Sequence, residues 1–376
     1  MIDYVNSSLG LINAILAYHK VKPHHQPLTL LDQYFQKQPQ NVVLLVLDGL
    51  GEMILNHFEP NGFLRQHQIG RINAVFPPTT VASINTLESG KSPKEHGWLG
   101  WSLYFHECDR FIDIFPNQDS FSEEKINIHD FDAKGLLQYQ DVYSQIKAQG
   151  SAQCYVIHPS NILKTGDGFE TVYTHNFEET LKVVRELCKD ETPKYIYAYS
   201  PEPDLSLHVL GTKSVEVGNK IAEMEFLIKS YLHDVKDSLV IITADHGLID
   251  IAEHIDVSSI PEINDLLVRP CFIEPRCTSF FVQAGKKDEF RTNFMKFFKD
   301  DFILFEKNDP ELVELFGNGI PHFKFNDFLG DFVSIATKNK TLIYKGSRAK
   351  SSFSFKAHHA GFTDEERIVP LIVISN

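Results

Sequence analysis

The sequence predicts an α/β fold in which a mostly parallel central sheet is flanked by helices, with a smaller α+β subdomain inserted. Short apolar segments that are typical of buried strands alternate with longer amphipathic segments that are typical of helices. The clearest strand is NVVLLVLDGLG (Asn41–Gly51), which is apolar throughout and then runs into Asp48 and a glycine-rich turn. A chain of 376 residues can bury one large core, with or without a smaller second one.

The elements follow this alternation along the chain. Helical periodicity predicts helices over Leu9–Tyr18, Asn176–Cys188 and Ser214–His233. Continuous apolar runs predict further buried strands at Cys154–His158, Lys194–Ser200 and Ser238–Asp245. Because strands and helices alternate, most strands of the sheet should be parallel.

The pattern of predicted secondary structure changes between about Glu253 and Ser352. Short strand-like pieces there surround one helical stretch, Lys287–Lys299, and the segment IVPLIVIS near the C-terminus then resumes the pattern of the main sheet. We therefore expect a core made of residues 1–252 and 353–376 and an inserted α+β subdomain at 253–352.

Composition and charge exclude several classes of function. The net charge of −14 argues against nucleic-acid scaffold binding, which needs a basic face. The five cysteines are odd in number and lack CxxC spacing, so free thiols in a reducing compartment are expected. The N-terminal apolar run lacks a basic flank and is too short to cross a bilayer. We expect a cytoplasmic protein without a membrane segment; the oligomeric state cannot be predicted.

Acidic residues and histidines follow several predicted strands. Asp48, the motif DHG (Asp245–Gly247) and the segment SPEPDLSLH (Ser200–His208) each come after a strand, and ligands bind at this edge of parallel sheets. Asp204 and His208 are four residues apart, so on a helix they would share one side and form half of a site for a divalent metal. Each motif alone also fits a helix cap, a turn or a surface pair. Together with AHHAGF near the C-terminus, they favour a functional site.

The stretch FPPTTVASINTLESGKSPKEHG (Phe76–Gly97) predicts a helix that begins after two prolines. Thr79 fits the N-cap and Gly90 fits the C-terminal end. Thr80 then falls in the first turn, where the helix dipole and unpaired N–H groups stabilise negative charge. A metal-bound threonine alkoxide at this position would be a nucleophile toward phosphorus. On local sequence alone, a purely capping role for both threonines fits equally well.

The ordered motifs LVLDGLG, FPPTTVASINTLESGKSPKEHG, SPEPDLSLH, TADHG and HHAGF resemble the alkaline phosphatase superfamily. The resemblance is greatest to its type I phosphodiesterase/nucleotide pyrophosphatase branch. It extends from about residue 41 to the C-terminus and leaves the first forty residues and the insertion uncovered. The resemblance implies an alkaline phosphatase-like core and a phosphodiesterase or nucleotide pyrophosphatase activity on a small-molecule phosphate ester.

The resemblance also implies two metal sites. The ligands of one site would be Asp48, Thr80, Asp245 and His246. The ligands of the other would be Asp204, His208 and His359. His359 fits the family pattern of a histidine followed by two small residues, and His358 is the alternative. The mixed aspartate and histidine ligands suit zinc first and manganese second.

Thr80 is the catalytic residue that the resemblance implies. Counting back from Ser89-Gly90, which matches the Thr-Gly pair that closes the nucleophile helix of the family, selects Thr80 over Thr79. Thr80 would attack phosphorus and form a phospho-threonine intermediate. Two cations roughly 4 Å apart would stabilise the attacking and leaving oxygens. The insertion and the region Cys108–Asp132 are expected to cover this catalytic site and to select the leaving group.

The sequence departs from the family pattern at Trp101. Members of the branch carry an asparagine at this register that holds a phosphoryl oxygen, and an aromatic platform for the substrate would replace it here. Packing is the commoner role of tryptophan, and it is the alternative for Trp101. No arginine is an obvious candidate to grip a terminal phosphate, which favours a diester over a monoester.

Three other functions compete with this reading. A phosphomonoesterase and a metal-dependent phosphosugar mutase belong to the same superfamily. A non-catalytic, metal-stabilised binding protein is the third, and it conflicts with the complete ligand set. The absence of a Cys-x-Pro-x-Arg pattern in the Phe76–Gly97 stretch argues against a sulfatase.

Overall fold

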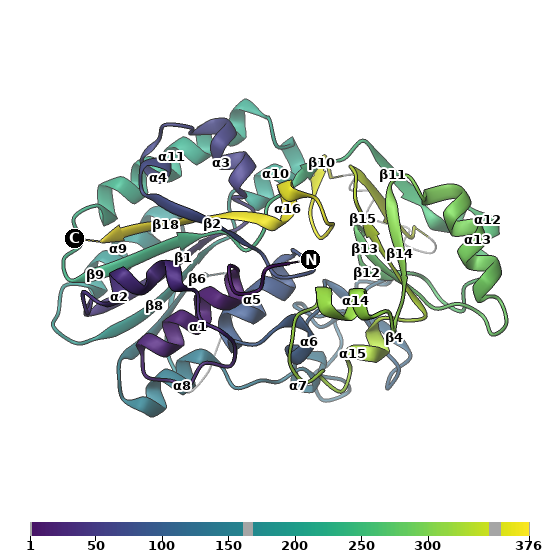
Figure 1. Ribbon diagram of the computed structural model, residues 1–376, viewed down its shortest axis with the longest axis horizontal. Coiled ribbons are helices and arrows are strands. Elements are labelled where there is room, and N and C mark those ends of the chain that lie inside the picture. The colour runs from purple at the N-terminus through teal and green to yellow at the C-terminus, as the bar shows by residue number, and fades with distance from the viewer. Residues whose placement is uncertain (1, 161–167, 346–354, 376) are drawn as a thin grey trace.

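The computed structural model describes residues 2–160, 168–345 and 355–375 and contains two seven-stranded sheets set side by side (Figure 1). The main sheet has the order β2-β18-β9-β1-β8-β6-β7. Its strands are β1 (Asn41–Leu47), β2 (Gln68–Asn73), β6 (Gln153–Pro159), β7 (Glu170–Thr174), β8 (Lys194–Ser200), β9 (Ser238–Thr243) and β18 (Ile368–Ser375).

The five strands from β9 to β7 are parallel, and β18 pairs antiparallel with both β9 and β2. All seven residues of β1 are buried because helices cover both faces of the sheet. The predicted α/β fold, its four apolar strands and the return of the C-terminal segment to the main sheet are confirmed.

Helices lie on both faces of the main sheet (Figure 1). One face carries α1 (Ser8–Tyr18), α5 (Thr80–Ser89) and α8 (Val142–Gln149). The other carries α3 (Glu52–Phe58), α4 (Phe63–Gln66), α9 (Phe177–Leu187), α10 (Asp204–Leu210) and α11 (Val215–Leu232). The side chains of Asn176 and Ser214 accept hydrogen bonds from first-turn N–H groups, so the two long predicted helices begin where their caps indicate.

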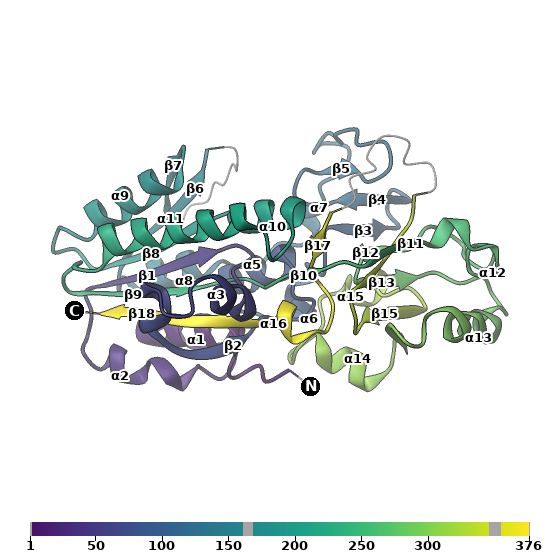
Figure 2. The same ribbon diagram turned by 90° about the horizontal axis from the view of Figure 1, so that it is seen from above.

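The second sheet is antiparallel and has the order β14-β15-β13-β12-β3-β4-β5 (Figure 2). Four strands come from the segment predicted as an insertion: β12 (Phe272–Glu274), β13 (Cys277–Phe280), β14 (Phe302–Glu306) and β15 (Phe332–Ala336). The other three are β3 (Ser102–Phe105), β4 (Arg110–Asp113) and β5 (Gln118–Asp119). The two segments expected to cover the site thus share one sheet, and the boundary at residues 253–352 stays a prediction.

One long helix, α13 (Lys287–Phe298), covers this second sheet, as its sequence predicts. Phe290, Phe294 and Phe298 recur every fourth residue and are buried. Phe290 lies 5.1 Å from Phe280 of β13 and 5.2 Å from Phe332 of β15 between ring centroids. This aromatic stripe holds the helix on the sheet.

Shorter elements complete the described part of the chain. Two small sheets are formed by β10 (Ile249–Asp250) with β17 (Ala357–His358) and by β11 (Glu253–Asp256) with β16 (Lys340–Ile343). The remaining helices are α2 (Asp32–Phe35), α6 (Pro93–His96), α7 (Ala133–Leu136), α12 (Pro261–Asn264), α14 (Pro310–Leu315), α15 (Phe325–Phe328) and α16 (Asp364–Arg367), with 3₁₀ turns at Thr29–Leu31 and Val257–Ser259.

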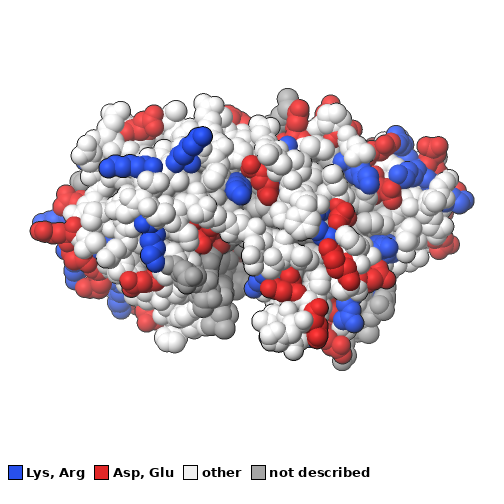
Figure 3. All heavy atoms as spheres, turned by 90° about the horizontal axis from the view of Figure 1, so that it is seen from below, with Lys and Arg blue, Asp and Glu red and all other residues white. Residues whose placement is uncertain are grey.

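The surface is hollowed between the part of the molecule that contains the main sheet and the part that contains the second sheet (Figure 3). The carboxyl ends of the parallel strands face the second sheet (Figure 2). Among the helices of the described residues, none combines the length and apolar character that crossing a membrane requires.

Candidate functional site

Three aspartates meet at the carboxyl edge of the main sheet. Asp48 directly follows β1, Asp245 follows β9, and Asp204 begins α10 just after β8. Gly49 lets these segments approach: its φ is +75°, and a Cβ there would lie 2.9 Å from the Cα of Asp204. Its N–H donates a hydrogen bond to Asp245 Oδ1 over 3.1 Å. The predicted strand ends therefore form one site.

The four residues predicted for the first metal site converge around His246. Its Nε2 lies 3.1 Å from Thr80 Oγ1, 3.4 Å from Asp48 Oδ1 and 3.5 Å from Asp245 Oδ2. Thr80 Oγ1 in turn lies 3.5 Å from Asp48 Oδ2. Thr80 is the first residue of α5, so its hydroxyl sits at the positive end of that helix.

The three residues predicted for the second site also lie together. His208 Nε2 is 3.4 Å from Asp204 Oδ1, and the rings of His208 and His359 are 5.1 Å apart. The His359 ring stacks on that of His246 at 3.9 Å. Ligand atoms of Asp204, His246 and His359 all lie within 4.8 Å of one another, so His246 borders both sites, whereas His208 stands beside this group.

His358 occupies a different place from its neighbour. It belongs to β17, and its Nδ1 accepts a hydrogen bond from the backbone N–H of His359. Of the two metal-capable groups found within residues 2–160, 168–345 and 355–375, one contains His359 and neither contains His358.

Backbone carbonyls orient two of the histidines. His208 Nδ1 lies 2.8 Å from the carbonyl oxygen of Ala357, and His246 Nδ1 lies 3.2 Å from that of Gly247. A carbonyl can only accept, so Nδ1 of each ring must carry the proton. Nε2 of both rings is then left with its lone pair facing the carboxylates, as a metal ligand requires.

The site contains buried carboxylates that bound cations would stabilise. Burial, followed by the charge of Asp245, raises the pKa of Asp48 and of Asp204 well above the ordinary range. One oxygen of each aspartate and Nδ1 of His359 are buried without a hydrogen-bond partner. In the described part of the chain, no lysine or arginine forms an ion pair with the three carboxylates. Unpartnered carboxylate and imidazole atoms at this spacing fit divalent metal ions.

The chain matches the family described as type I phosphodiesterase / nucleotide pyrophosphatase over residues 42–359. It belongs to this family. The family is metal-dependent, and membership supports the predicted phosphoester hydrolase activity. No curated protein sequence matches the chain.

Solved structures share the fold of this phosphodiesterase-family protein. Murine ectonucleotide pyrophosphatase/phosphodiesterase 5 superposes with a TM-score of 0.63 and 16% identity over 89% of this chain and 88% of that one. Its inactive variant, a threonine-to-alanine substitution in complex with AMP, gives 0.63 and 17% over 89% and 87%. Phosphonoacetate hydrolase from Sinorhizobium meliloti, in complex with phosphonoacetate, gives 0.64 and 15% over 90% of both chains.

Trp101, the predicted substrate-binding residue of this phosphodiesterase-family chain, lies on the side of the site formed by the second sheet. Its side chain is 44% exposed and its ring meets Phe115 edge-on at 5.9 Å. Its backbone N–H donates to Glu274 Oε1 over 2.8 Å. By contrast, Trp98 is buried and its Nε1–H donates to the carbonyl of Leu137, which is a packing role. The side chain of Trp101 is therefore accessible to a ligand.

Sequence reasoning missed two side chains that touch the predicted site residues. The hydroxyl of Tyr199 in β8 donates to Asp48 Oδ2, which leaves Oδ1 of that aspartate to face His246. Glu274 of β12 accepts a hydrogen bond from Thr79, next to Thr80. Tyr199 belongs to the alternating tyrosines of KYIYAYS, a pattern that packing alone would explain. Glu274 has no recognisable motif around it. The sequence near these two residues therefore did not indicate that they contact the site.

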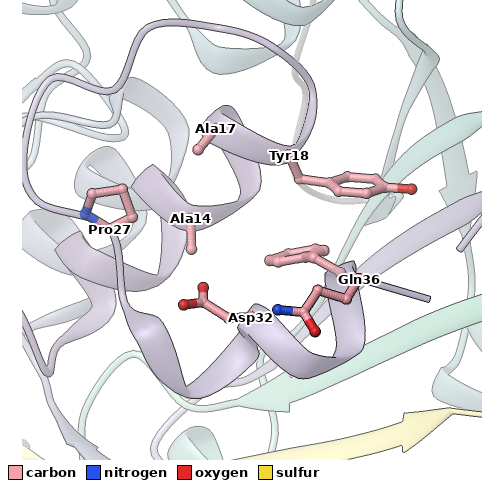
Figure 4. A pocket seen from close by; sticks show the side chains of 7 residues that line it. Ala14, Ala17, Tyr18, Pro27, Asp32 and Gln36 are labelled. Carbon is pink, nitrogen blue, oxygen red and sulfur yellow. The ribbon is translucent and has the colours of Figure 1, made fainter. Parts of the chain in front are cut away.

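Two surface hollows lie away from this site. One, of about 340 Å³, is lined by Ala14, Ala17, Tyr18, Pro27, Asp32, Phe35 and Gln36 around α1 and α2 (Figure 4). The other, also of about 340 Å³, is lined by residues between Cys108 and Phe131. Neither contains a predicted ligand or the predicted nucleophile.

Proposed function

We propose that the chain is a two-metal phosphodiesterase or nucleotide pyrophosphatase that acts through a phospho-threonine intermediate on Thr80. The observation that carries the proposal is the convergence of Thr80 Oγ1 with His246 and the carboxylates of Asp48 and Asp245, 3.1–3.5 Å apart, at the first residue of α5. Asp204, His208 and His359 stand beside them as ligands for a second ion. Zinc suits this donor set best, with manganese second.

Divalent cations bound at these ligands would lower the pKa of the Thr80 hydroxyl and neutralise charge that gathers on the phosphoryl group. The chain's own residues do the rest. Thr80 loses its hydroxyl proton and its Oγ1 forms a bond to phosphorus, while the P–O bond to the group on the far side breaks and that oxygen takes up a proton as the alcohol leaves. First-turn N–H groups of α5 would donate hydrogen bonds to the phosphoryl oxygens. Water then releases the phosphate from Thr80.

Diester preference and the role of Trp101 belong to the same proposal. The half-exposed indole would support a flat group of the substrate, as in a nucleotide, since it stands beside the segment that carries Thr79. We also propose the cytoplasm as the location.

The first experiment measures hydrolysis of bis-p-nitrophenyl phosphate and p-nitrophenyl phosphate with zinc or manganese. Phosphonoacetate is a third substrate, since a hydrolase of that compound shares the fold. We expect the diester to be cleaved fastest, EDTA to abolish cleavage, and Thr80→Ala to lower kcat by at least about a thousandfold. The matched control is Thr292→Ala on α13, an exposed threonine whose loss should leave kcat unchanged.

Three outcomes would overturn parts of the proposal. More than a tenth of the activity in Thr80→Ala would exclude Thr80 as the nucleophile. Faster cleavage of the monoester would assign a phosphomonoesterase. Zinc binding without turnover of any of the three substrates would favour a mutase or a metal-stabilised binding protein.

A further inference from the structure

Thr79 occupies the N-cap position of α5 but does not cap it. Its backbone has the extended conformation of a cap residue, φ −140° and ψ 149°, yet its side chain makes no capping hydrogen bond. A threonine at this position normally accepts a hydrogen bond from an N–H group of the first turn. Here Oγ1 of Thr79 instead donates to Oε1 of Glu274 over 2.8 Å.

As a result, the N–H groups in the first turn of α5 lack the hydrogen-bond acceptor that an N-cap side chain would supply. Among the described residues, the backbone N–H groups of Thr80, Val81 and Ala82 have no hydrogen-bond acceptor, and the first amide that is paired is that of Ser83, with the carbonyl of Thr79. Val81 and Ala82 are buried. Unpaired donors at a helix N-terminus bind anions. The Thr80 hydroxyl is on the same turn, 3.5 Å from Oδ2 of Asp48, and the other carboxylate oxygen of Asp48 is buried without a hydrogen-bond partner.

Glu274 is held at this point by the second sheet. Ile273, which precedes it, has φ +121°, a conformation that is strained for a β-branched residue and persists only where its surroundings enforce it. Ile273 is also the one residue of β12 that pairs with β3, opposite Ser102. Gly100 permits this approach, because a Cβ there would lie 2.6 Å from Cγ2 of Ile273 and 3.0 Å from Cγ of Glu274.

One carboxylate oxygen therefore serves two segments of the site. Oε1 of Glu274 accepts from Thr79 Oγ1 and from the N–H of Trp101, each over 2.8 Å. Glu274 is buried, and its burial raises its pKa to about 7, while the hydrogen bonds from Thr79 and Trp101 oppose that rise. Oε1 can accept both hydrogen bonds in either protonation state of the carboxyl group.

We propose that Glu274 is a positioning residue that draws the Thr79 hydroxyl away from the end of α5 and so keeps the first-turn N–H groups free for the phosphoryl oxygens of the substrate. The inference rests on the proposed function. It makes the second sheet a part of phosphoryl binding, because the acceptor that keeps α5 open belongs to β12.

The test compares Glu274→Met, which keeps the bulk but removes the acceptor, with the double variant Glu274→Met/Thr79→Val, whose valine has no hydroxyl. In the zinc-loaded single variant the freed Thr79 hydroxyl caps α5. Calorimetry should then show inorganic phosphate binding about tenfold more weakly, and the KM for a diester should rise while kcat changes less, in line with the energy of one N-cap hydrogen bond. The double variant should recover phosphate affinity to within about threefold.

Amide hydrogen exchange gives a readout that needs no metal and no turnover. In the metal-free protein, exchange at Val81 and Ala82 should slow in Glu274→Met and return to the wild-type rate in the double variant. Glu274→Gln, the milder change, keeps an acceptor oxygen for Thr79 and should bind phosphate within about threefold of wild type.

The outcomes separate this inference from the proposed function. If wild type binds phosphate and cleaves a diester but the double variant is as weak as Glu274→Met, Glu274 only holds the two segments together and the inference is wrong. A tenfold loss in Glu274→Gln with unchanged exchange would assign the effect to charge and also overturn it. Wild type that neither binds phosphate nor cleaves an ester would reject both the inference and the proposed function.

Discussion

Among single residues, His96 shows how the burial of one side chain makes the stability of the fold depend on pH. Its Nδ1 accepts a hydrogen bond from the N–H of Trp98 over 3.0 Å, and its Nε2 lies 3.1 Å from Oγ1 of Thr86 in α5. Burial lowers the pKa of His96 to about 3, from an ordinary value of 6.5. Between these two values the unfolded chain binds a proton that the folded chain does not. Stability must therefore fall as the pH drops below about 6.5.

We predict that His96→Gln reduces this pH dependence by the equivalent of one proton, about 1.4 kcal/mol per pH unit between pH 6 and 4. Urea unfolding in EDTA at several pH values measures the slope directly. The matched control is His129→Gln, which replaces an exposed histidine and should leave the slope unchanged. A slope in His96→Gln identical to that of wild type would contradict the assignment.

The approach of the three aspartates could be predicted from the sequence because each has a local signal. Asp48, Asp204 and Asp245 each lie at the end of a strand that its apolar residues reveal, so their approach followed from the parallel sheet. The N-cap position of Thr79 was also visible. The hydrogen bond that diverts its hydroxyl was not, because Glu274 lies 195 residues away in sequence.

At the scale of elements, α13 was predictable because its aromatic residues repeat with helical spacing. The short strands β3 to β5 were not: they are two to four residues long, and β3 joins the second sheet through a single residue pair with β12. Such strands are stabilised by their neighbours rather than by their own pattern. Local periodicity therefore predicts α13 but does not predict the short strands of the second sheet.

We expect Phe294→Ala to lower the free energy of unfolding by about 3–5 kcal/mol, because it leaves a cavity in the stripe between α13 and the second sheet. Phe297→Ala on the same helix is the matched control, since Phe297 is 39% exposed and should cost about 0.5 kcal/mol or less. Urea denaturation of both variants checks the difference. Equal losses would mean that α13 does not pack through the Phe294 face.

At the scale of the whole molecule, a buried ion pair joins the second sheet to the segments that carry His246 and His359. Arg276, in the turn between β12 and β13, donates two hydrogen bonds of 2.6 and 2.8 Å to Glu366 of α16, and both side chains are fully buried. Glu366 Oε1 accepts the N–H of Gly361, close to His359. The backbone carbonyl of Glu366 accepts the N–H of Gly247, next to His246. The pair thus fixes both histidines at once.

Arg276→Met should destabilise the fold by about 3–5 kcal/mol, because it leaves the carboxylate of Glu366 buried and unpaired. It should also weaken zinc binding, measured by competition with a colorimetric chelator, since the loop that carries His359 loses its anchor. Adding Glu366→Leu removes the unpaired charge and should restore part of the stability. Arg269→Met is the matched control, because Arg269 pairs with the exposed Asp109; zinc affinity lost equally in that variant would refute the anchoring role.

The sequence by itself determined the main sheet, its long helices, and the residue types and order of the proposed ligands. Apolar periodicity and the short motifs after strands are local properties, and a parallel sheet gathers them at one edge. Tertiary structure alone decided that residues 102–119 join the later strands in the second sheet and that Glu274 reaches Thr79. It also decided that Arg276 anchors the loop of His359. These contacts join strands and loops that are far apart in the chain. A short stretch of sequence therefore does not predict them.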